Sequence, residues 1–355
     1  MKNHSILHLF DPKDVETFVR QDGKYPFRRS HRASLKYRLD RPELYLDGGL
    51  FCENEPSWYR QRNQFHQRLL SIQQVAANIE KLDEVNHALI DQIDNCLEKN
   101  RNTIGNFQAI YMWALGSTLK LFLDLNVYKL EDELVRTLIQ ELHNSLTGTD
   151  GTEIKSNKWL KQPSKCPYYG MLEQSQEVLY RFVSEQVEQR KTESASNALY
   201  LSDWLFKDHL KQSDVISFII DTLMAGLHTT SYTVANLLNH IANEKAIRDS
   251  LQKEIQEFLS VQESITKHHI DKLRSLRSCL KETMRLNPVL IGTGRLTTEK
   301  LVVRNYEITA NIIVITQNQV ISLNETLNFY EPNKFKPERW FHYRTCPHLT
   351  IWIWS

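Results

Sequence analysis

The stretch from about Ser213 to Ala242 constrains the fold of this chain more than any other segment. Its central part reads VISFIIDTLMAGLHTT, so apolar residues occupy nearly every face of the helix that the pattern predicts. A helix without a polar face is stable in water only when other elements surround it. We therefore expect most of this helix to be buried inside a larger body.

Much of the remaining chain predicts amphipathic helices. Short helices are expected from Phe10 to about Gly23 and from Pro56 to Leu70, where Ser57 is a suitable N-cap. Apolar residues also recur at three- and four-residue spacing in 72–100, 104–123, 130–147, 172–190, 244–259 and 270–286.

Two regions depart from the helical pattern. The segment 148–170 is polar and contains Gly148 and Gly151, which predicts a loop. Beyond Asn287-Pro288, β-branched runs separated by polar residues predict short strands at 301–303, 306–308 and 312–315. The expected fold class is mainly α with a small β region.

The composition disfavours several classes of protein and of site. Lys and Arg number 44 against 43 Asp and Glu, so the bulk charge does not favour a nucleic-acid partner. The five cysteines form no CxxC pair, which disfavours a disulfide framework or a structural zinc site and indicates a reducing compartment. No run of about 18 apolar residues predicts a membrane span. The opening MKNHSILHLFDPKD has neither a secretory nor a transit-peptide pattern.

Four short motifs follow one another along the chain. Each contains side chains one helical turn apart or a compact polar group, and alone each is a common surface feature. They are WYRQR with Trp58 and Arg62, AGLHTT at 225–230, ETMR with Glu282 and Arg285, and PERW with Arg339.

This ordered set resembles the cytochrome P-450 family, and the opening HLFDPKDVE and DGKYPFR is similar to its mitochondrial members. The resemblance covers residues 1–341, so we expect a partial cytochrome P-450 domain followed by a divergent tail at 342–355. It implies a fold that is incomplete at the C-terminus and also at the N-terminus.

The resemblance assigns structural and haem-binding roles. It implies that Glu282, Arg285 and Arg339 form a buried triad, in which the carboxylate satisfies the guanidinium donors. It also implies that Trp58, Arg62 and Arg295 donate hydrogen bonds to haem propionates. The alternative for Trp58 and Arg62 is an amphipathic helix anchor with an exposed arginine.

The AGLHTT motif is similar to the oxygen-binding stretch of the family's central helix. By this resemblance Ala225 and Gly226 let the helix open for dioxygen, and Thr229 supplies a hydroxyl for proton delivery. His228 stands where the family usually has an acidic residue, and an imidazole can also relay protons. The alternative is that Ala225-Gly226 marks a close helix crossing, Thr229 bonds to its own helix, and His228 is a buried structural histidine.

Partners follow from the same resemblance. Arg277 and Lys281 lie at i, i+4 and match the basic pair that docks an adrenodoxin-like ferredoxin, which its reductase supplies with electrons. The alternative is an ordinary solvated helix face. The implied location is the matrix side of the mitochondrial inner membrane, with peripheral membrane association and no nucleic-acid partner.

The expected thiolate ligand of the haem iron is the point where the resemblance fails. The family motif FxxGxRxCxG should follow PERW, but Cys346 has no glycine around it and follows Arg339 too closely. The implied function is a haem-dependent monooxygenase that hydroxylates an apolar steroid- or sterol-like substrate, such as an ecdysteroid, with O2 and ferredoxin electrons. The alternatives are a non-catalytic fragment or isoform that lacks the ligand, and a helical interaction protein whose motifs are accidental.

Overall fold

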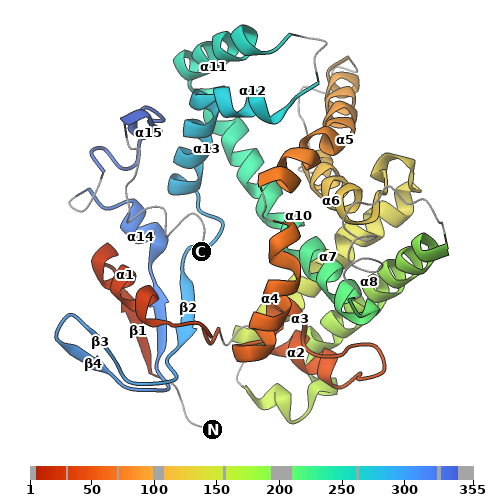
Figure 1. Cartoon of the computed structure of the whole chain (residues 1–355), viewed down its shortest axis with the longest axis vertical. Helices are drawn as coiled ribbons and strands as arrows, with labels where there is room; N and C mark the ends of the chain where they lie inside the picture. The colour runs from red at the N-terminus through yellow and green to blue at the C-terminus, as the bar shows by residue number, and fades with distance from the viewer. Residues whose placement is uncertain are drawn as a thin grey trace. The chain divides into compact units, whose positions relative to one another are not determined.

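The computed structural model describes residues 5–28, 31–69, 72–98, 108–154, 157–192, 210–260, 264–325 and 329–342. The chain divides into two compact units, Ser30–Ser231 and Met1–Arg29 with Tyr232–Ser355. The first is referred to below as the helical unit and the second as the mixed unit (Figure 1). The prediction of a mainly α fold with a small β region is confirmed.

The helical unit is built from α-helices joined by short 3-10 turns. Its elements are α2 (Arg32–Leu39), α3 (Gly49–Cys52), α4 (Glu55–Leu69), α5 (Ile72–Glu98), α6 (Gln108–Leu123), η1 (Val127–Lys129), α7 (Asp132–Ile154), η2 (Asn157–Leu160), η3 (Pro163–Lys165), α8 (Pro167–Thr192) and the first part of α10 (Gln212–Asn243). The core of this unit joins side chains of α6, α7, α8 and α10, among them Leu119, Leu142, Val183 and Ile219.

The burial predicted for the central helix is confirmed over its N-terminal half. Most α10 residues from Asp214 to Leu227 are buried, including Val215 and Ile220 at 0% exposure. Phe218 of this helix stacks on Phe65 of α4, with ring centroids 3.9 Å apart. Since α10 packs against neighbours on all sides here, it fixes where those neighbours lie.

The loop predicted at 148–170 is wrong at both ends, because α7 continues to Ile154 and α8 begins at Pro167. A Cβ on Gly148 would lie 2.6 Å from the carbonyl oxygen of Tyr168, and one on Gly151 would lie 2.2 Å from the Tyr168 ring. These glycines therefore permit close contact with the start of α8 instead of ending the helix. Sequence alone does not separate this use of glycine from its use in turns.

The mixed unit combines a small sheet with helices. Its elements are β1 (Ile6–Leu9), α1 (Pro12–Gln21), the remainder of α10, α11 (Lys245–Phe258), α12 (Lys267–Lys272), α13 (Arg274–Leu286), β2 (Thr293–Leu296), β3 (Leu301–Val303), β4 (Tyr306–Ile308), β5 (Ile313–Thr316), α14 (Asn318–Ser322) and α15 (Arg339–His342). Strands β3, β4 and β5 lie where short strands were predicted, whereas β1 and β2 were missed.

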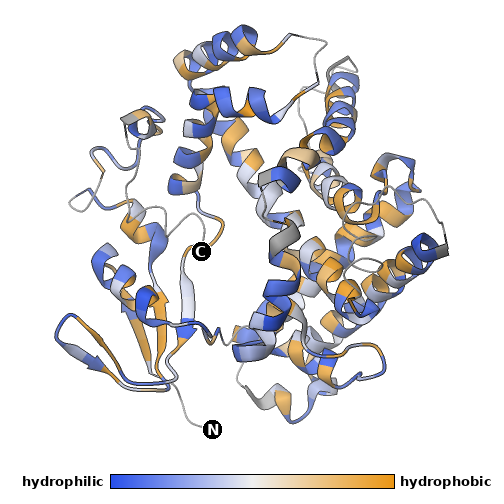
Figure 2. Ribbon diagram, viewed as in Figure 1, coloured by the Kyte–Doolittle hydropathy of each residue, from blue (hydrophilic) through white to orange (hydrophobic). Residues whose placement is uncertain are grey.

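A three-stranded sheet joins the two ends of the mixed unit. The strand order is β1-β5-β2, with β1 parallel and β2 antiparallel to the central β5. Leu7 and Arg295 both pair with Val314 in the register. Figure 2 shows hydrophobic residues along β1 and β5, and the small core that includes Val314 also contains Val15 and Phe18 of α1. β1 pairs with a strand about 300 residues later in the chain, so the sequence around it contains little local pattern from which a strand could be predicted.

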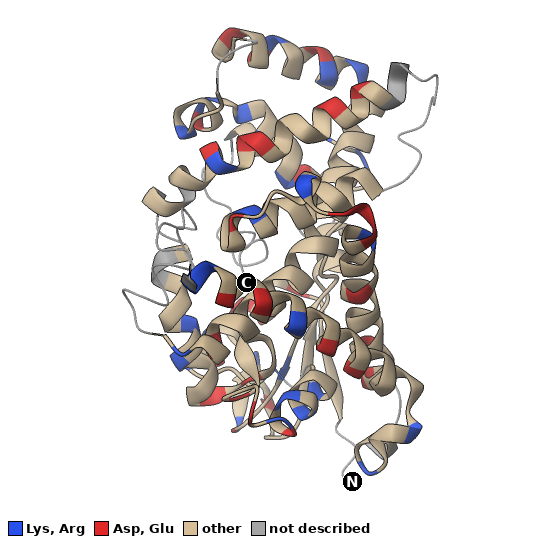
Figure 3. Cartoon of the chain, turned by 90° about the vertical axis from the view of Figure 1, so that its right-hand side faces the viewer, with Lys and Arg blue, Asp and Glu red and all other residues tan. Residues whose placement is uncertain are grey.

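The charged residues agree with the balanced composition. Figure 3 shows Lys and Arg interspersed with Asp and Glu along the helices instead of gathered by sign. Within the part of the chain that is described, no helix has the length and apolar character needed to cross a membrane.

A buried ion pair connects α2 to α10 in the helical unit. The Arg38 and Asp221 side chains are 0% and 2% exposed, and Arg38 Nη2 lies 2.6 Å from Asp221 Oδ1. Arg38 Nη1 also donates to the Gly48 carbonyl at 2.9 Å, and Asp221 Oδ2 accepts from the Phe51 amide at 3.2 Å. Gly49 has φ +80°, and a Cβ there would lie 2.1 Å from Arg38 Nη1. The pair therefore orders the chain between α2 and α4.

Replacing Asp221 with Ala should destabilise the chain strongly. The change leaves the Arg38 guanidinium buried without its counter-charge, which costs about 3–5 kcal/mol of unfolding free energy. Urea unfolding followed by circular dichroism measures this loss. The control is Asp40→Asn, which removes the partly exposed pair with Lys36 at the end of the same α2 and should cost about 1 kcal/mol or less. Equal losses in both variants would contradict the assignment.

Candidate functional site

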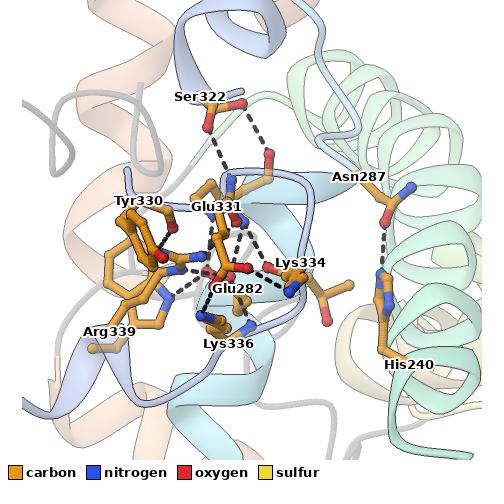
Figure 4. Close-up of polar contacts among 12 residues, drawn as sticks. His240, Glu282, Asn287, Ser322, Tyr330, Glu331, Lys334, Lys336 and Arg339 are labelled. Atoms are coloured by element: carbon orange, nitrogen blue, oxygen red, sulfur yellow. Dashed lines mark hydrogen bonds and ion pairs between the residues drawn. The ribbon is translucent and has the colours of Figure 1, made fainter. Parts of the chain in front are cut away.

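A single buried carboxylate organises the C-terminal part of the mixed unit (Figure 4). Glu282 of α13 has a fully buried side chain. It accepts from Arg285 Nε at 2.9 Å and Nη2 at 2.8 Å, and from Arg339 Nε at 3.1 Å. The Lys336 amide at 3.0 Å and the Trp340 indole at 2.9 Å complete the set. The structure therefore brings together the three residues of the expected triad and adds two donors that sequence reasoning missed.

The two arginines use their remaining donors on backbone carbonyls. Arg285 donates to the carbonyls of Ser322 at 2.9 Å and Lys334 at 3.3 Å. Arg339 donates to the carbonyl of Glu331 at 2.8 Å. A guanidinium has five donors, and buried ones need partners. The cluster thus ties α13, the end of α14 and the segment before α15 into one body.

Two further contacts within the mixed unit fix the ends of α13. The carboxylate of Glu254 on α11 accepts from the Ser275 amide at 2.9 Å and the Leu276 amide at 3.3 Å, which satisfies free donors at the helix start. At the other end, His240 of α10 lies 2.7 Å from the Asn287 side chain, as Figure 4 shows. The His240 ring also stacks on Phe335, with centroids 4.5 Å apart.

The predicted docking cations both have local partners. Arg277 is exposed, donates to the Ile270 carbonyl at 3.2 Å and lies 3.6 Å from Asp271. Lys281 lies over the Trp340 ring, 5.6 Å from its centroid. Both side chains lie near the surface of α13, and each also contacts another residue of the chain.

Helix α4 brings the expected propionate donors together. The Arg62 guanidinium lies over the Trp58 ring at 5.2 Å and is exposed to solvent. Arg60 points to a different set of partners and bridges Asp47 at 2.5 Å and Asp214 at 3.2 Å. Since Asp214 lies at the start of α10, Arg60 sets the rotation of α4. Sequence reasoning missed this role of Arg60, which stands inside the quoted motif.

The AGLHTT motif has the contacts that its structural alternative describes. Thr229 Oγ1 donates to the Ala225 carbonyl at 2.6 Å. A Cβ on Gly226 would lie 2.9 Å from Thr118 Oγ1 of α6. Gly226 therefore permits a close helix crossing, and the Thr229 hydroxyl is used within its own helix in this conformation.

His228 faces two aromatic side chains of the helical unit. Its ring centroid lies 5.4 Å from both the Tyr111 ring of α6 and the His143 ring of α7. Its Nε2 is buried and has no hydrogen-bond partner among the described residues. Burial, and secondly the nearby His143, lower the pKa of the His228 imidazole. The ring is therefore neutral at neutral pH.

Arg295 is engaged by a carboxylate of the chain itself. Its Nε donates to Asp22 Oδ2 at 2.7 Å, and Nη1 donates to the Gly294 carbonyl at 3.0 Å. Burial raises the pKa of Asp22, and Arg295 opposes that shift. The partner Asp22 was missed, although it stands in the DGKYP stretch that resembles mitochondrial members.

None of the three cysteine side chains that are described suits a thiolate ligand. Cys52 and Cys279 are buried and Cys166 is partly exposed. Burial, followed by Glu254 and Glu282, raises the pKa of Cys279 to about 12. Cys346 and the side chain of Cys96 lie outside the described residues. In the described ranges, no group of three His, Cys, Asp or Glu could hold a metal ion.

Replacing Glu282 with Gln should loosen the whole cluster. An amide cannot accept from every donor at this position, and it leaves two buried guanidinium groups without a counter-charge, a loss of about 3–5 kcal/mol. Limited proteolysis should then cut between 329 and 340 faster than in the wild type. Glu338→Gln, an exposed change in the same segment, is the control. Unchanged cleavage in Glu282→Gln would show that the cluster does not hold this segment.

Cysteine labelling tests the state of the thiols. With a pKa of about 12 and a buried side chain, Cys279 should resist iodoacetamide, since the thiolate is the reactive form. Cys166 should be labelled faster because it is partly exposed. Mass spectrometry after brief alkylation at about pH 8 measures both. Rapid labelling of Cys279 in the native chain would contradict its described burial.

Comparison with known proteins identifies the family that this chain matches. The family model described as Cytochrome P450 matches residues 1–346. "Cytochrome P450 302a1, mitochondrial" of Drosophila melanogaster is 28% identical, over 98% of this chain and 72% of the relative. "Ecdysone 20-monooxygenase" of Drosophila melanogaster and the Mus musculus "1,25-dihydroxyvitamin D(3) 24-hydroxylase, mitochondrial" are each 22% identical. The chain covers 65% of each of these two relatives, and the alignments span 95% and 94% of this chain.

A solved structure has the same fold. The structure titled "Zebra fish cytochrome P450 another structure with Progesterone" matches with a TM-score of 0.76 at 16% identity, over 96% of this chain and 80% of that one. The family match spans all of the described residues, in both units. This chain belongs to the cytochrome P450 family.

Proposed function

We propose that this chain represents a haem-dependent monooxygenase that hydroxylates an apolar, steroid- or sterol-like substrate with O2 and electrons from a ferredoxin. Family membership and relatives that are named as an ecdysone 20-monooxygenase and a dihydroxyvitamin D(3) 24-hydroxylase support the reaction type and substrate class. The observation that carries the proposal is the Glu282 cluster, because it rigidly ties α13 to the segment ahead of the expected haem-binding region.

Haem, the cofactor of the family, supplies the oxygen-activating chemistry when bound. The exposed Arg62, stacked on Trp58, has donors available for a propionate carboxylate. We assign Arg295 to the same role, with Asp22 as the group that orients it. Nη2 is the donor of Arg295 that takes no part in these two contacts, and we assign it to a propionate. The described cysteines do not fit the thiolate that would bind the haem iron.

We assign the handling of protons to the middle of α10. The Thr229 hydroxyl can move a proton only after it leaves the Ala225 carbonyl, so a local opening of the helix at Gly226 is part of this proposal. His228 would act as a neutral proton acceptor in the position where the family usually has an acid. The Ala225-Gly226 pair makes the opening less costly because glycine lowers helix propensity.

The electron donor is assigned to the exposed face of α13. Arg277 and Lys281 would attract an acidic, adrenodoxin-like ferredoxin, which receives electrons from its reductase. For this, Arg277 must exchange its contact with Asp271 for one with the partner. Relatives named as mitochondrial support a location in the mitochondrion, for which we propose the matrix side of the inner membrane and peripheral association. The same names support electron supply by a ferredoxin.

A second candidate is a non-catalytic member of the family. It is favoured by one observation, namely that Cys52, Cys166 and Cys279 are thiols without the environment of a haem ligand. Such a chain would keep the helical body and bind haem weakly or not at all.

Haem uptake distinguishes the two candidates. Hemin titrated into the purified chain should bind, and Arg62→Leu should weaken the affinity by about tenfold because one propionate loses a charged donor. Arg136→Leu, an exposed arginine on α7, should leave the affinity unchanged.

The spectrum under carbon monoxide after reduction completes this test. A thiolate-type Soret band supports the monooxygenase. Haem uptake without that band, or no uptake, contradicts it and supports the non-catalytic member.

A further inference from the structure

Two imidazoles of the helical unit form a pair that the family motifs do not account for. His143 of α7 and His228 of α10 have ring centroids 5.4 Å apart and planes tilted by 57°. The two rings differ in their surroundings, since His143 is exposed to solvent whereas Nε2 of His228 is fully buried. One member therefore meets water and the other lies beside Thr229 within the central helix.

The surroundings of His228 favour proton exchange within this pair. The titratable groups that face it are Tyr111 of α6, in an edge-to-face contact, and His143 of α7. A buried polar nitrogen without a hydrogen bond is destabilising, and the packing of aromatic rings around it does not offset that cost. Neighbouring imidazoles that are not directly hydrogen-bonded can exchange a proton through one water molecule that bonds to both.

We propose that His143 and His228 form a two-imidazole proton entry, in which His143 is the solvent-side relay that reprotonates His228. This inference rests on the proposed function, because it supplies the protons that oxygen chemistry beside Thr229 consumes. A proton from bulk water binds His143, passes through a bridging water to neutral His228, and leaves from His228 toward the Thr229 side. No electrons move, and the complete passage of one proton returns the pair to its starting charge.

His143 is a relay that acts through His228, and a purely structural role would leave proton exchange unchanged. The test uses the full chain with 15N-labelled histidine and needs no haem. Ring-nitrogen NMR measures the titration of His228 and the rate at which its ring proton exchanges with water. His143→Gln keeps a polar side chain of similar reach. His87→Gln changes another exposed histidine, on α5, and is the matched control.

In His143→Gln the exchange of the His228 ring proton should slow by roughly tenfold or more, since a positioned acid–base group is lost. The pKa of His228 should rise at the same time, because a neighbouring imidazolium no longer opposes its charge. His87→Gln should change neither value. Exchange as fast in His143→Gln as in the wild type, with both variants folded by circular dichroism, would overturn the proposal. Failed haem uptake would instead overturn the proposed function and leave this result standing.

Discussion

The buried carboxylate of Glu282 is the interaction on which the C-terminal half of the structure depends. It compensates the charge of Arg285 and Arg339 and also binds the indole of Trp340. A lone buried ion of this kind would be strongly unfavourable, so the carboxylate and its donors must fold together. As a result, the position of the segment before α15 is set by α13 and not by local backbone preference. The Glu282 cluster can therefore support a site that needs the segment before α15 to be held in place.

In the helical unit, other ion pairs fix the positions of neighbouring helices. Arg38 and Asp221 attach α2 to α10, and Arg60 attaches α4 to the start of the same helix through Asp214. Trp58 and Arg62 therefore lie on a helix whose rotation is fixed by buried or half-buried charges. These ties leave Arg62 with its donors toward solvent, which is the state expected of a group that binds an anionic cofactor.

Local motifs could be read from the sequence because their geometry is local. Glu282 and Arg285 are one turn apart, and the apolar run around Ile219 allowed only a buried helix. Only the family resemblance predicted that Arg339 belongs to this cluster. The donors from Lys336 and Trp340 were not predicted, because a loop and not helical spacing determines their position. Pairs far apart in sequence, such as Arg295 with Asp22, leave no periodic signal. Gly148 and Gly151 misled the helix prediction because close packing and turns both select glycine.

We expect one porphyrin to bind the helical unit through the donors of α4. A crystal structure of the chain reconstituted with hemin measures this directly. One bound porphyrin with a propionate contacted by Trp58 and Arg62 is the predicted result. A porphyrin bound away from both side chains would contradict the proposed function.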